Sequence, residues 1–142
     1  MATWFWVALG GALGSMARFG LATAAASLTG PQFPWGTMLI NIGGSFLIGW
    51  FGALARSQGV LAVPPDIRIF VMVGICGGFT TFSSFSLQTY DLLRSGFWGK
   101  ALVNIGLSVL LCLGAVALGH IIAQQSSHSV TIAQIKEEEY TG

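Results

Sequence analysis

The hydrophobic positions form four long runs separated by short polar or proline-containing segments. The runs extend from Met1 to about Leu28, from Trp35 to about Arg56, from Ile69 to Tyr90 and from Ala101 to about Ala123. A helix that crosses the hydrocarbon core of a bilayer needs about 20 predominantly apolar residues, and each run comes close to or exceeds that length. The sequence therefore predicts an all-α membrane protein with four transmembrane helices.

The segments between the runs carry turn-forming residues. Gly30–Pro34 contains two prolines and a glycine, Pro64-Pro65-Asp66 precedes the third run, and Ser95-Gly96-Phe97 precedes the fourth. A cleavable signal peptide needs a basic region before its apolar part. Here the only basic residue near the first run, Arg18, follows its charge-free part, Met1 to Ala17. We therefore expect a retained first helix.

Composition agrees with a single membrane domain. Charged residues make up 8% of the chain, against about 25% in a soluble domain, so most of the surface does not face water. We expect one four-helix transmembrane domain over residues 1–125 and a polar, solvated and frayed tail over residues 126–142. No segment is large enough for a soluble enzymatic module, so we do not expect an enzyme. The formal net charge of +1 provides no basic field for nucleic acid.

The charges near the membrane are balanced between the two sides. Arg94 and Lys100 belong to one side, Arg56 and Arg68 to the other, and Lys136 lies farther out. Because an excess of basic residues sets the orientation of a membrane protein, a balanced chain has no reason to choose one orientation. Four helices are also too few to enclose a polar path and shield it from lipid. Both arguments predict an antiparallel homodimer of dual topology.

Small and polar residues repeat at four-residue spacing in the first, second and fourth runs. Gly10, Gly14 and Arg18 share one face of the first helix, where the glycines favour close helix packing. A guanidinium within a span needs a partner or an interface, so we expect Arg18 at a vestibule or a subunit interface. Asn41 in the second helix must form a hydrogen bond, either across a helix interface or along a polar path. Asn104, Ser108 and Cys112 form a weakly polar stripe on the fourth helix.

The third run contains the most informative segment, Gly77-Gly78-Phe79-Thr80-Thr81-Phe82-Ser83-Ser84-Phe85. Paired glycines followed by paired threonines form a continuous helix poorly, so we expect the third helix to be broken near its middle. A break at that depth needs protein or a water-filled cavity around it, and it frees carbonyl oxygens for a hard cation and amides for an anion. Phe82 and Phe85 share a helix face, either as core packing or as a pore lining.

Three motifs together resemble the Fluc (CrcB) family of fluoride channels over essentially the whole chain except the tail. They are Gly11-Ala12-Leu13-Gly14 leading to Arg18, Gly36-Thr37 leading to Asn41 and Gly44-Ser45-Phe46, and the segment from Gly77 to Phe85. The resemblance implies an antiparallel homodimer with two fluoride pores and a central sodium ion, in the plasma (inner) membrane of a prokaryote. Its expected partners are fluoride, a second copy of the chain and the lipid bilayer.

The same resemblance implies roles for individual residues. Phe82 and Phe85 would present their ring edges to the anion, and Asn41 would donate to it. The carbonyls of Gly77 and Thr80 from both subunits would ligate the sodium ion. The expected polar residues along the ion pathway are Thr81, Ser83, Ser84 and Ser108. Phe79 and Asn104 depart from the family pattern, which leaves the role of Asn104 open.

Two other functions are consistent with a small membrane protein. A dual-topology, proton-coupled exporter would need a carboxylate within the membrane. The acidic residues before the tail are Asp66, in a loop, and Asp91, at a helix end. A non-transporting membrane scaffold would explain the small-residue faces, but it would leave the buried Asn41 and the broken third helix without a purpose.

Overall fold

The computed structural model describes residues 2–30, 32–55 and 63–141, with side chains described over residues 3–126 of these ranges. The elements are α1 (Ala2–Thr29), α2 (Trp35–Leu54), α3 (Pro65–Ile69), η1 (Phe70–Cys76), α4 (Gly77–Phe79), α5 (Phe82–Arg94) and α6 (Trp98–Thr141). Within the described ranges, four helical stretches are long and apolar enough to cross a membrane: Thr3–Thr29, Trp35–Leu54, Pro65–Arg94 and Trp98–Ser126. The prediction of four membrane spans is confirmed, and the chain is a multi-pass membrane protein.

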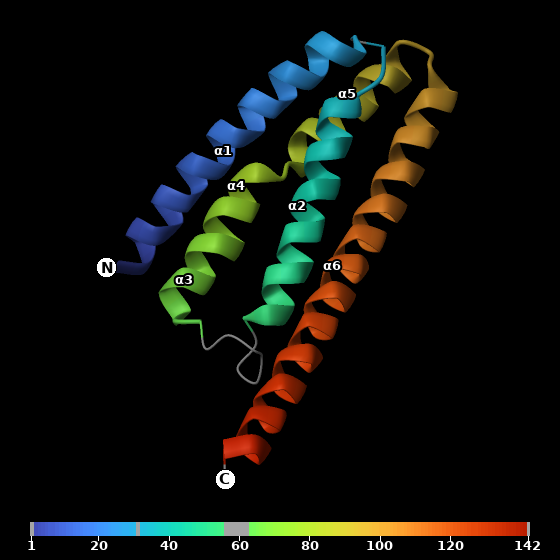
Figure 1. Ribbon diagram of the computed structural model, residues 1–142. Coiled ribbons are helices and arrows are strands. Elements are labelled where there is room, and N and C mark those ends of the chain that lie inside the picture. The colour runs from blue at the N-terminus through green and yellow to red at the C-terminus, as the bar shows by residue number, and fades with distance from the viewer. Residues whose placement is uncertain (1, 31, 56–62, 142) are drawn as a thin grey trace.

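The four spans alternate in direction, so both termini lie at the same end of the bundle (Figure 1). At the other end, the ammonium of Lys100 donates to the carbonyl oxygen of Gln32 at 3.4 Å and so joins the first and third connections. Arg94 and Lys100 lie at this end and Arg68 at the end with the termini, as the sequence predicts. Arg56 lies outside the described residues.

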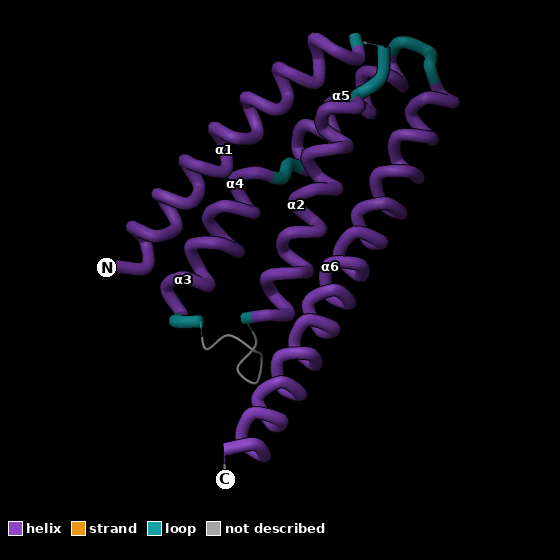
Figure 2. The backbone as a smooth tube through the Cα atoms, viewed as in Figure 1, coloured by secondary structure: helices purple, strands orange, loops and turns teal. Residues whose placement is uncertain are grey.

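Two glycines allow the connections at that end to turn. Gly30 has φ of 71° and Gly96 has φ of 81°, and they are the only described residues with positive φ. An L-residue with a side chain avoids this region, whereas glycine enters it without a steric cost. Each glycine follows the end of a helix, so the chain turns sharply there toward the next span (Figure 2).

The third span is composed of several pieces. Pro65 starts α3 at a position where its missing amide hydrogen has no helical partner to lose, and the wider π-helical turns of η1 follow. After α4, Thr80 (φ −80°, ψ 158°) and Thr81 (φ −152°, ψ 112°) have extended backbone. Helix α5 then begins at Phe82, and Figure 2 shows the non-helical link between α4 and α5.

Glycines let the helix backbones of the first and third spans touch. A Cβ atom on Gly10 would lie 2.5 Å from the carbonyl oxygen of Phe70, and one on Gly78 would lie 2.6 Å from that of Gly11. A Cβ on Gly14 would clash with the carbonyl oxygen of Ile75. The prediction that the first-helix glycines serve close packing is therefore confirmed.

Helices α2 and α6 pack in the same way along the other side of the bundle. A Cβ atom on Gly49 would meet the carbonyl oxygen of Val116, and one on Gly119 would meet that of Phe46. The side chains buried in the bundle are mostly small, such as Ala101 and Ala115. Large apolar side chains point outward, as expected for a surface that lipid covers.

Helix α6 extends beyond its membrane span as far as Thr141. The expectation of a frayed tail over residues 126–142 is therefore wrong for the backbone, which is helical up to that residue. The reason lies in the sequence, because no glycine or proline follows Gly119 until Gly142. The intervening segment contains helix-forming alanine, glutamine, lysine and glutamate residues.

Candidate functional site

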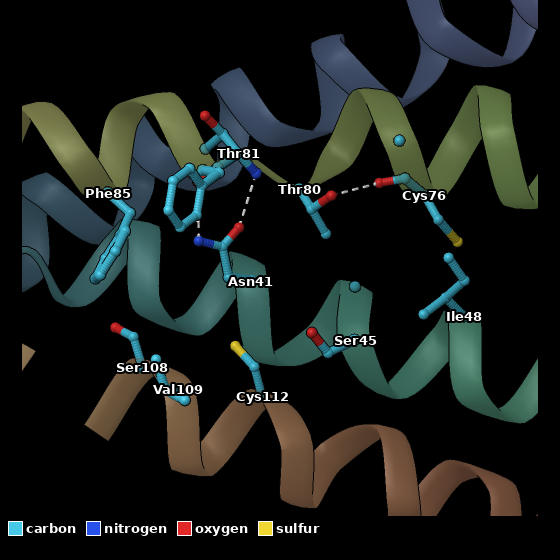
Figure 3. A pocket seen from close by; sticks show the side chains of 13 residues that line it. Asn41, Ser45, Ile48, Cys76, Thr80, Thr81, Phe85, Ser108, Val109 and Cys112 are labelled. Atoms are coloured by element: carbon cyan, nitrogen blue, oxygen red, sulfur yellow. Dashed lines mark hydrogen bonds between the residues drawn. The ribbon is translucent and has the colours of Figure 1, made fainter. Parts of the chain in front are cut away.

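A cavity of about 320 Å³ lies between α2, the link that follows α4, the start of α5 and the middle of α6 (Figure 3). It brings together seven of the ten residues that the sequence singles out: Asn41, Gly77, Thr80, Thr81, Phe82, Phe85 and Ser108. Ser83, Ser84 and Arg18 do not line it. The cavity therefore gathers polar groups from three of the four spans at the level of the extended link.

Asn41 holds the extended link through both ends of its amide. Its Nδ2 donates to the carbonyl oxygen of Thr81 at 3.0 Å, and the backbone amide of Thr81 donates to its Oδ1 at 2.8 Å. An unpaired backbone group in a membrane interior costs several kcal/mol. Asn41 supplies the partner of the Thr81 amide and a further donor to the Thr81 carbonyl. The side chain thus bonds across a helix interface and lines the cavity as well, which combines the two alternatives that the sequence left open.

The hydroxyl of Thr81 connects the two serines that lie outside the cavity. Its Oγ1 accepts from the backbone amide of Ser84 at 3.1 Å, which caps the start of α5. The same oxygen lies 3.0 Å from the Ser84 hydroxyl and 3.1 Å from the Ser83 hydroxyl. Ser83 and Ser84 therefore support the link through Thr81.

The hydrogen bonds of the link leave two carbonyl oxygens without their usual helical partners. In an unbroken helix the amide of Thr81 would bond the carbonyl of Gly77, and the amide of Ser84 would bond that of Thr80. Instead these amides donate to Asn41 Oδ1 and to Thr81 Oγ1. Carbonyl oxygens suit a hard cation, so the donor set of Gly77 and Thr80 fits the sodium ion that the resemblance implies.

Gly77 itself is not required by the packing of its own chain. Its φ is −66° and its ψ is −37°, which any residue adopts in a helix. A Cβ atom there would lie 4.0 Å from the carbonyl oxygen of Met72, which is an ordinary van der Waals contact. The single chain therefore has room for a side chain at this position, in contrast to Gly78.

Arg18 reaches the same region from α1. Its Nε donates to the carbonyl oxygen of Gly78 at 3.0 Å, and the hydroxyl of Ser15 lies 3.4 Å from the same oxygen. The helical partner of this carbonyl would be the amide of Phe82, which lies beyond the extended link. The guanidinium thus stabilises the negative end of α4, a contact that the sequence analysis did not foresee.

Phe82 and Phe85 lie one turn apart at the start of α5 and line the cavity together. Their ring centroids are 5.4 Å apart and the ring planes are inclined by 44°. Phe82 is 78% exposed although it lines the cavity. The cavity is therefore open toward the surface of the single chain on this side.

Asn104 and Thr89 form a buried polar contact beside the cavity. The amide Nδ2 of Asn104 donates to Thr89 Oγ1 at 2.8 Å, and the hydroxyl of Ser108 donates to Asn104 Oδ1 at 3.4 Å. Asn104 is only 1% exposed. Thr89 was missed by the sequence analysis, although its spacing of four from Phe85 places both on one face of α5.

Other lining residues continue the polar stripes noted in the sequence. Ser45 follows Asn41 by one helical turn on α2, and Cys112 follows Ser108 by one turn on α6. In Figure 3 both Ser108 and Cys112 point from α6 into the space that faces α2. Four-residue spacing from a polar residue is the signal in the sequence that indicates both of them.

The cavity combines hydrogen-bond donors with an uncharged wall. None of the described residues that line it carries a charged side chain. An amide and several hydroxyl groups can donate to an anion, and the edges of the phenylalanine rings carry partial positive charge. Such a surface can replace part of the hydration shell of a small anion without trapping the ion on a fixed charge.

A second cavity lies at the end of the bundle that holds the first and third connections. Its volume is about 820 Å³, and its polar lining includes Gln32, Gln88, Asp91 and Lys100. Three residues follow one another along α6 at single-turn spacing. Lys100 lines this second cavity, Ser108 lines the first cavity, and Asn104 lies between them. Asn104 and Thr89 therefore occupy the level between the two cavities.

Comparison with known proteins identifies the family. Residues 5–120 match the family model described as CrcB-like protein, Camphor Resistance (CrcB). A protein of Methylobacterium radiotolerans named fluoride-specific ion channel FluC is 51% identical over 134 residues, which cover 94% of this chain and 93% of the relative. Proteins of the same name from Gluconobacter oxydans and Methylocella silvestris are 53% identical over 135 residues and 55% identical over 120 residues. These alignments cover 94% and 84% of this chain and 93% and 92% of the two relatives. The chain therefore belongs to the CrcB family.

Proposed function

We propose that this protein is a fluoride-selective ion channel through which fluoride leaves the cell passively. The observation that carries the proposal is the uncharged cavity lined by the amide of Asn41, the hydroxyls of Thr81 and Ser108, and the rings of Phe82 and Phe85. The name of the relatives, fluoride-specific ion channel, supports the same function. A channel needs no catalytic residue, in agreement with a chain that is not an enzyme.

The chemistry of the cavity suits fluoride more than larger halides. Fluoride holds its water tightly, so a pore must offer several donors close together in place of that water. The amide and hydroxyl donors are short and closely spaced, and the ring edges add electropositive surface. A fixed basic side chain would bind the ion more firmly, whereas conduction needs binding that is weak enough to release it.

A proton-coupled exporter is the alternative that the cavity disfavours. Such a protein needs an ionisable carboxylate in the membrane. In the described part of the third span, Asp66 lies in the first turn of α3 and Asp91 near the end of α5. Neither of them lines the first cavity. A non-transporting scaffold would have no use for a cavity lined by donors.

Efflux from liposomes tests the proposed function. Purified protein in liposomes loaded with potassium fluoride is expected to release fluoride rapidly once valinomycin provides a counter-ion path, as an ion-selective electrode records. Chloride release from matched liposomes should stay near that of protein-free vesicles, because a larger and less hydrated ion gains less from closely spaced donors. Equal fluoride and chloride rates would contradict the selectivity.

We further propose that two chains form the channel as an antiparallel homodimer in the plasma membrane of a prokaryote. The open side of the cavity supports this, because Phe82 is both a lining residue and 78% exposed. Lipid at that opening would leave the ion path beside hydrocarbon, whereas a second copy would close it with protein. The balance of Arg94 and Lys100 against Arg68 and Arg56 supports opposite orientations.

The carbonyls of Gly77 and Thr80 are the proposed ligands of a central sodium ion between the two copies. The missing helical partners of these two carbonyls support this. The packing of a single chain leaves room for a side chain at Gly77. A glycine at such a position suggests that an atom from outside the chain comes close to it. A cation there would neutralise the partial negative charge of the free carbonyls. It would thereby stabilise the contact between the copies.

A change in charge balance tests the dual topology. The wild type with a reporter fused to its C-terminus should show both cytoplasmic and external populations. Gln32→Lys with Ser95→Lys adds two basic residues to one end, so the C-terminus should become external throughout. When this variant is expressed by itself, its fluoride efflux should be lost.

Co-expression provides the control for that experiment. A variant with Arg94→Gln and Lys100→Gln has the opposite bias, and together the two variants should restore efflux. A wild type with a single orientation would refute the antiparallel dimer. Full activity of either biased variant by itself would refute it as well.

A further inference from the structure

A chain of hydrogen bonds runs from the wall of the first cavity into the interface between α6 and α5. The hydroxyl of Ser108 donates to Asn104 Oδ1 at 3.4 Å, and Asn104 Nδ2 donates to Thr89 Oγ1 at 2.8 Å. The hydroxyl of Thr89 donates to the backbone carbonyl of Phe85 at 2.7 Å. The chain therefore begins and ends at residues that line the cavity, Ser108 and Phe85.

The direction of these bonds follows from the number of protons available. A serine or threonine hydroxyl has one proton, and a side-chain amide donates only through its nitrogen. Thr89 gives its proton to the Phe85 carbonyl, so the group that faces its oxygen must be the Asn104 nitrogen. The Asn104 oxygen then faces Ser108 and accepts the single proton of that hydroxyl.

The consequence concerns what Ser108 can offer to an anion. While its proton is directed to Asn104, the serine presents only an oxygen to the cavity, and an oxygen repels fluoride. The distance of 3.4 Å exceeds the usual range of about 2.5–3.0 Å for an O–H···O hydrogen bond. The bond is therefore weak, and the proton can turn away from Asn104 readily. The two bonds farther along the chain are short and hold the amide of Asn104 in place.

We propose that Asn104 is a positioning residue that competes with fluoride for the proton of Ser108. The Asn104 oxygen weakens the hold of Ser108 on the ion and so favours release toward the second cavity, whose Lys100 lies one turn beyond Asn104 on α6. Burial supports this role, because Asn104 is 1% exposed and Thr89 is 7% exposed. Neither side chain lines the cavity itself, so Asn104 acts through Ser108 and not by contact with the ion. The proposal rests on the proposed fluoride channel function.

A double-mutant cycle between Asn104 and Ser108 tests the proposal. The perturbing variant combines Thr89→Val with Asn104→Leu, because replacing both partners of a buried hydrogen bond costs less than leaving one unpaired. Fluoride current across planar bilayers, recorded over a range of fluoride concentrations, gives the half-saturating concentration and the maximal current separately. With Ser108 present, the double substitution should lower the half-saturating concentration by about twofold to tenfold, the factor that one net hydrogen bond provides. The maximal current should fall, because the ion leaves more slowly.

The control is the same substitution in a Ser108→Ala background. Without the serine proton there is nothing to compete for, so the half-saturating concentration should change by less than about twofold. If Asn104 had a merely structural role, the half-saturating concentration would change by the same factor in both backgrounds, and that result would overturn the proposal. A higher half-saturating concentration with Ser108 present would overturn it as well. If size-exclusion chromatography shows that the double substitution does not fold, Asn104→Ala replaces it in the same cycle. A wild type without fluoride current would overturn the channel function and this proposal together, whereas a conducting wild type without coupling would overturn this proposal alone.

Discussion

Phe82→Ile and Phe85→Ile are each expected to lower fluoride efflux about five- to thirtyfold while the protein remains folded. Both rings line the cavity, and the edges of aromatic rings carry partial positive charge. A cation over the face of a ring gains about 1–2 kcal/mol in a desolvated site, and we expect an anion at a ring edge to gain a similar amount. Isoleucine keeps much of the apolar volume and removes this interaction. Efflux from liposomes measures the loss, and size-exclusion elution checks the fold.

Phe79→Ile is the matched control for this experiment. Phe79 belongs to the same motif and lies beside Gly44 of α2, but it does not line the cavity. The substitution should therefore leave the efflux rate within about twofold of the wild type and cost at most about 1.5 kcal/mol of stability. Unchanged efflux in Phe82→Ile and Phe85→Ile would mean that the two rings serve as core packing.

Asn41→Leu is expected to have the largest effect on stability. The substitution removes the partner of the Thr81 amide, and it removes a second donor from the Thr81 carbonyl, which as the N-cap of α5 also accepts the first helical bond. A buried polar group that loses its partner costs about 1–3 kcal/mol, and this cost applies to the Thr81 amide. Thermal unfolding in detergent should show a markedly lower midpoint, and fluoride efflux should disappear because the cavity loses its amide donor.

Ser45→Ala separates the two roles of Asn41. Ser45 lines the same cavity one turn farther along α2, and replacing its hydroxyl leaves the bonds of the extended link intact. The unfolding midpoint of the Ser45→Ala variant should therefore stay close to that of the wild type. If Asn41→Leu abolished efflux but kept the wild-type midpoint, Asn41 would act as a donor to the ion without bracing the link.

The number and direction of the spans could be predicted from the sequence, because the length of each apolar run reflects the thickness of the bilayer. The sequence also placed weak helix formers over residues 77–81, where Thr80 and Thr81 have extended backbone. The π-helical turns of η1, where Gly74 lies against Gly10 of α1, could not be predicted from residue types alone. The polarity of the tail predicts a frayed segment, but its alanine, glutamine, lysine and glutamate residues favour the helix that the structure has there.

The site could be predicted only as far as residue types and helix faces allow. Spacing placed Phe82 with Phe85 and Asn41 with Ser45, and the structure brings these residues to one cavity. The partner of each polar side chain could not be predicted, because it depends on the contact between spans that are far apart in sequence. Arg18 on the Gly78 carbonyl and Asn104 on Thr89 are two such partners.

The order in which the chain is synthesised bears on how the extended link can enter a membrane. The side chains that satisfy its backbone come from α1 and α2, through Arg18 and Asn41, and from the hydroxyl of Thr81 within the link itself. All of the partners from other spans precede residue 77 in the sequence, so they leave the ribosome before the link does. The Gly78 carbonyl and the Thr81 amide can therefore find their partners before α6 has been made. The carbonyls of Gly77 and Thr80, as proposed ligands of the central cation, wait for the second copy.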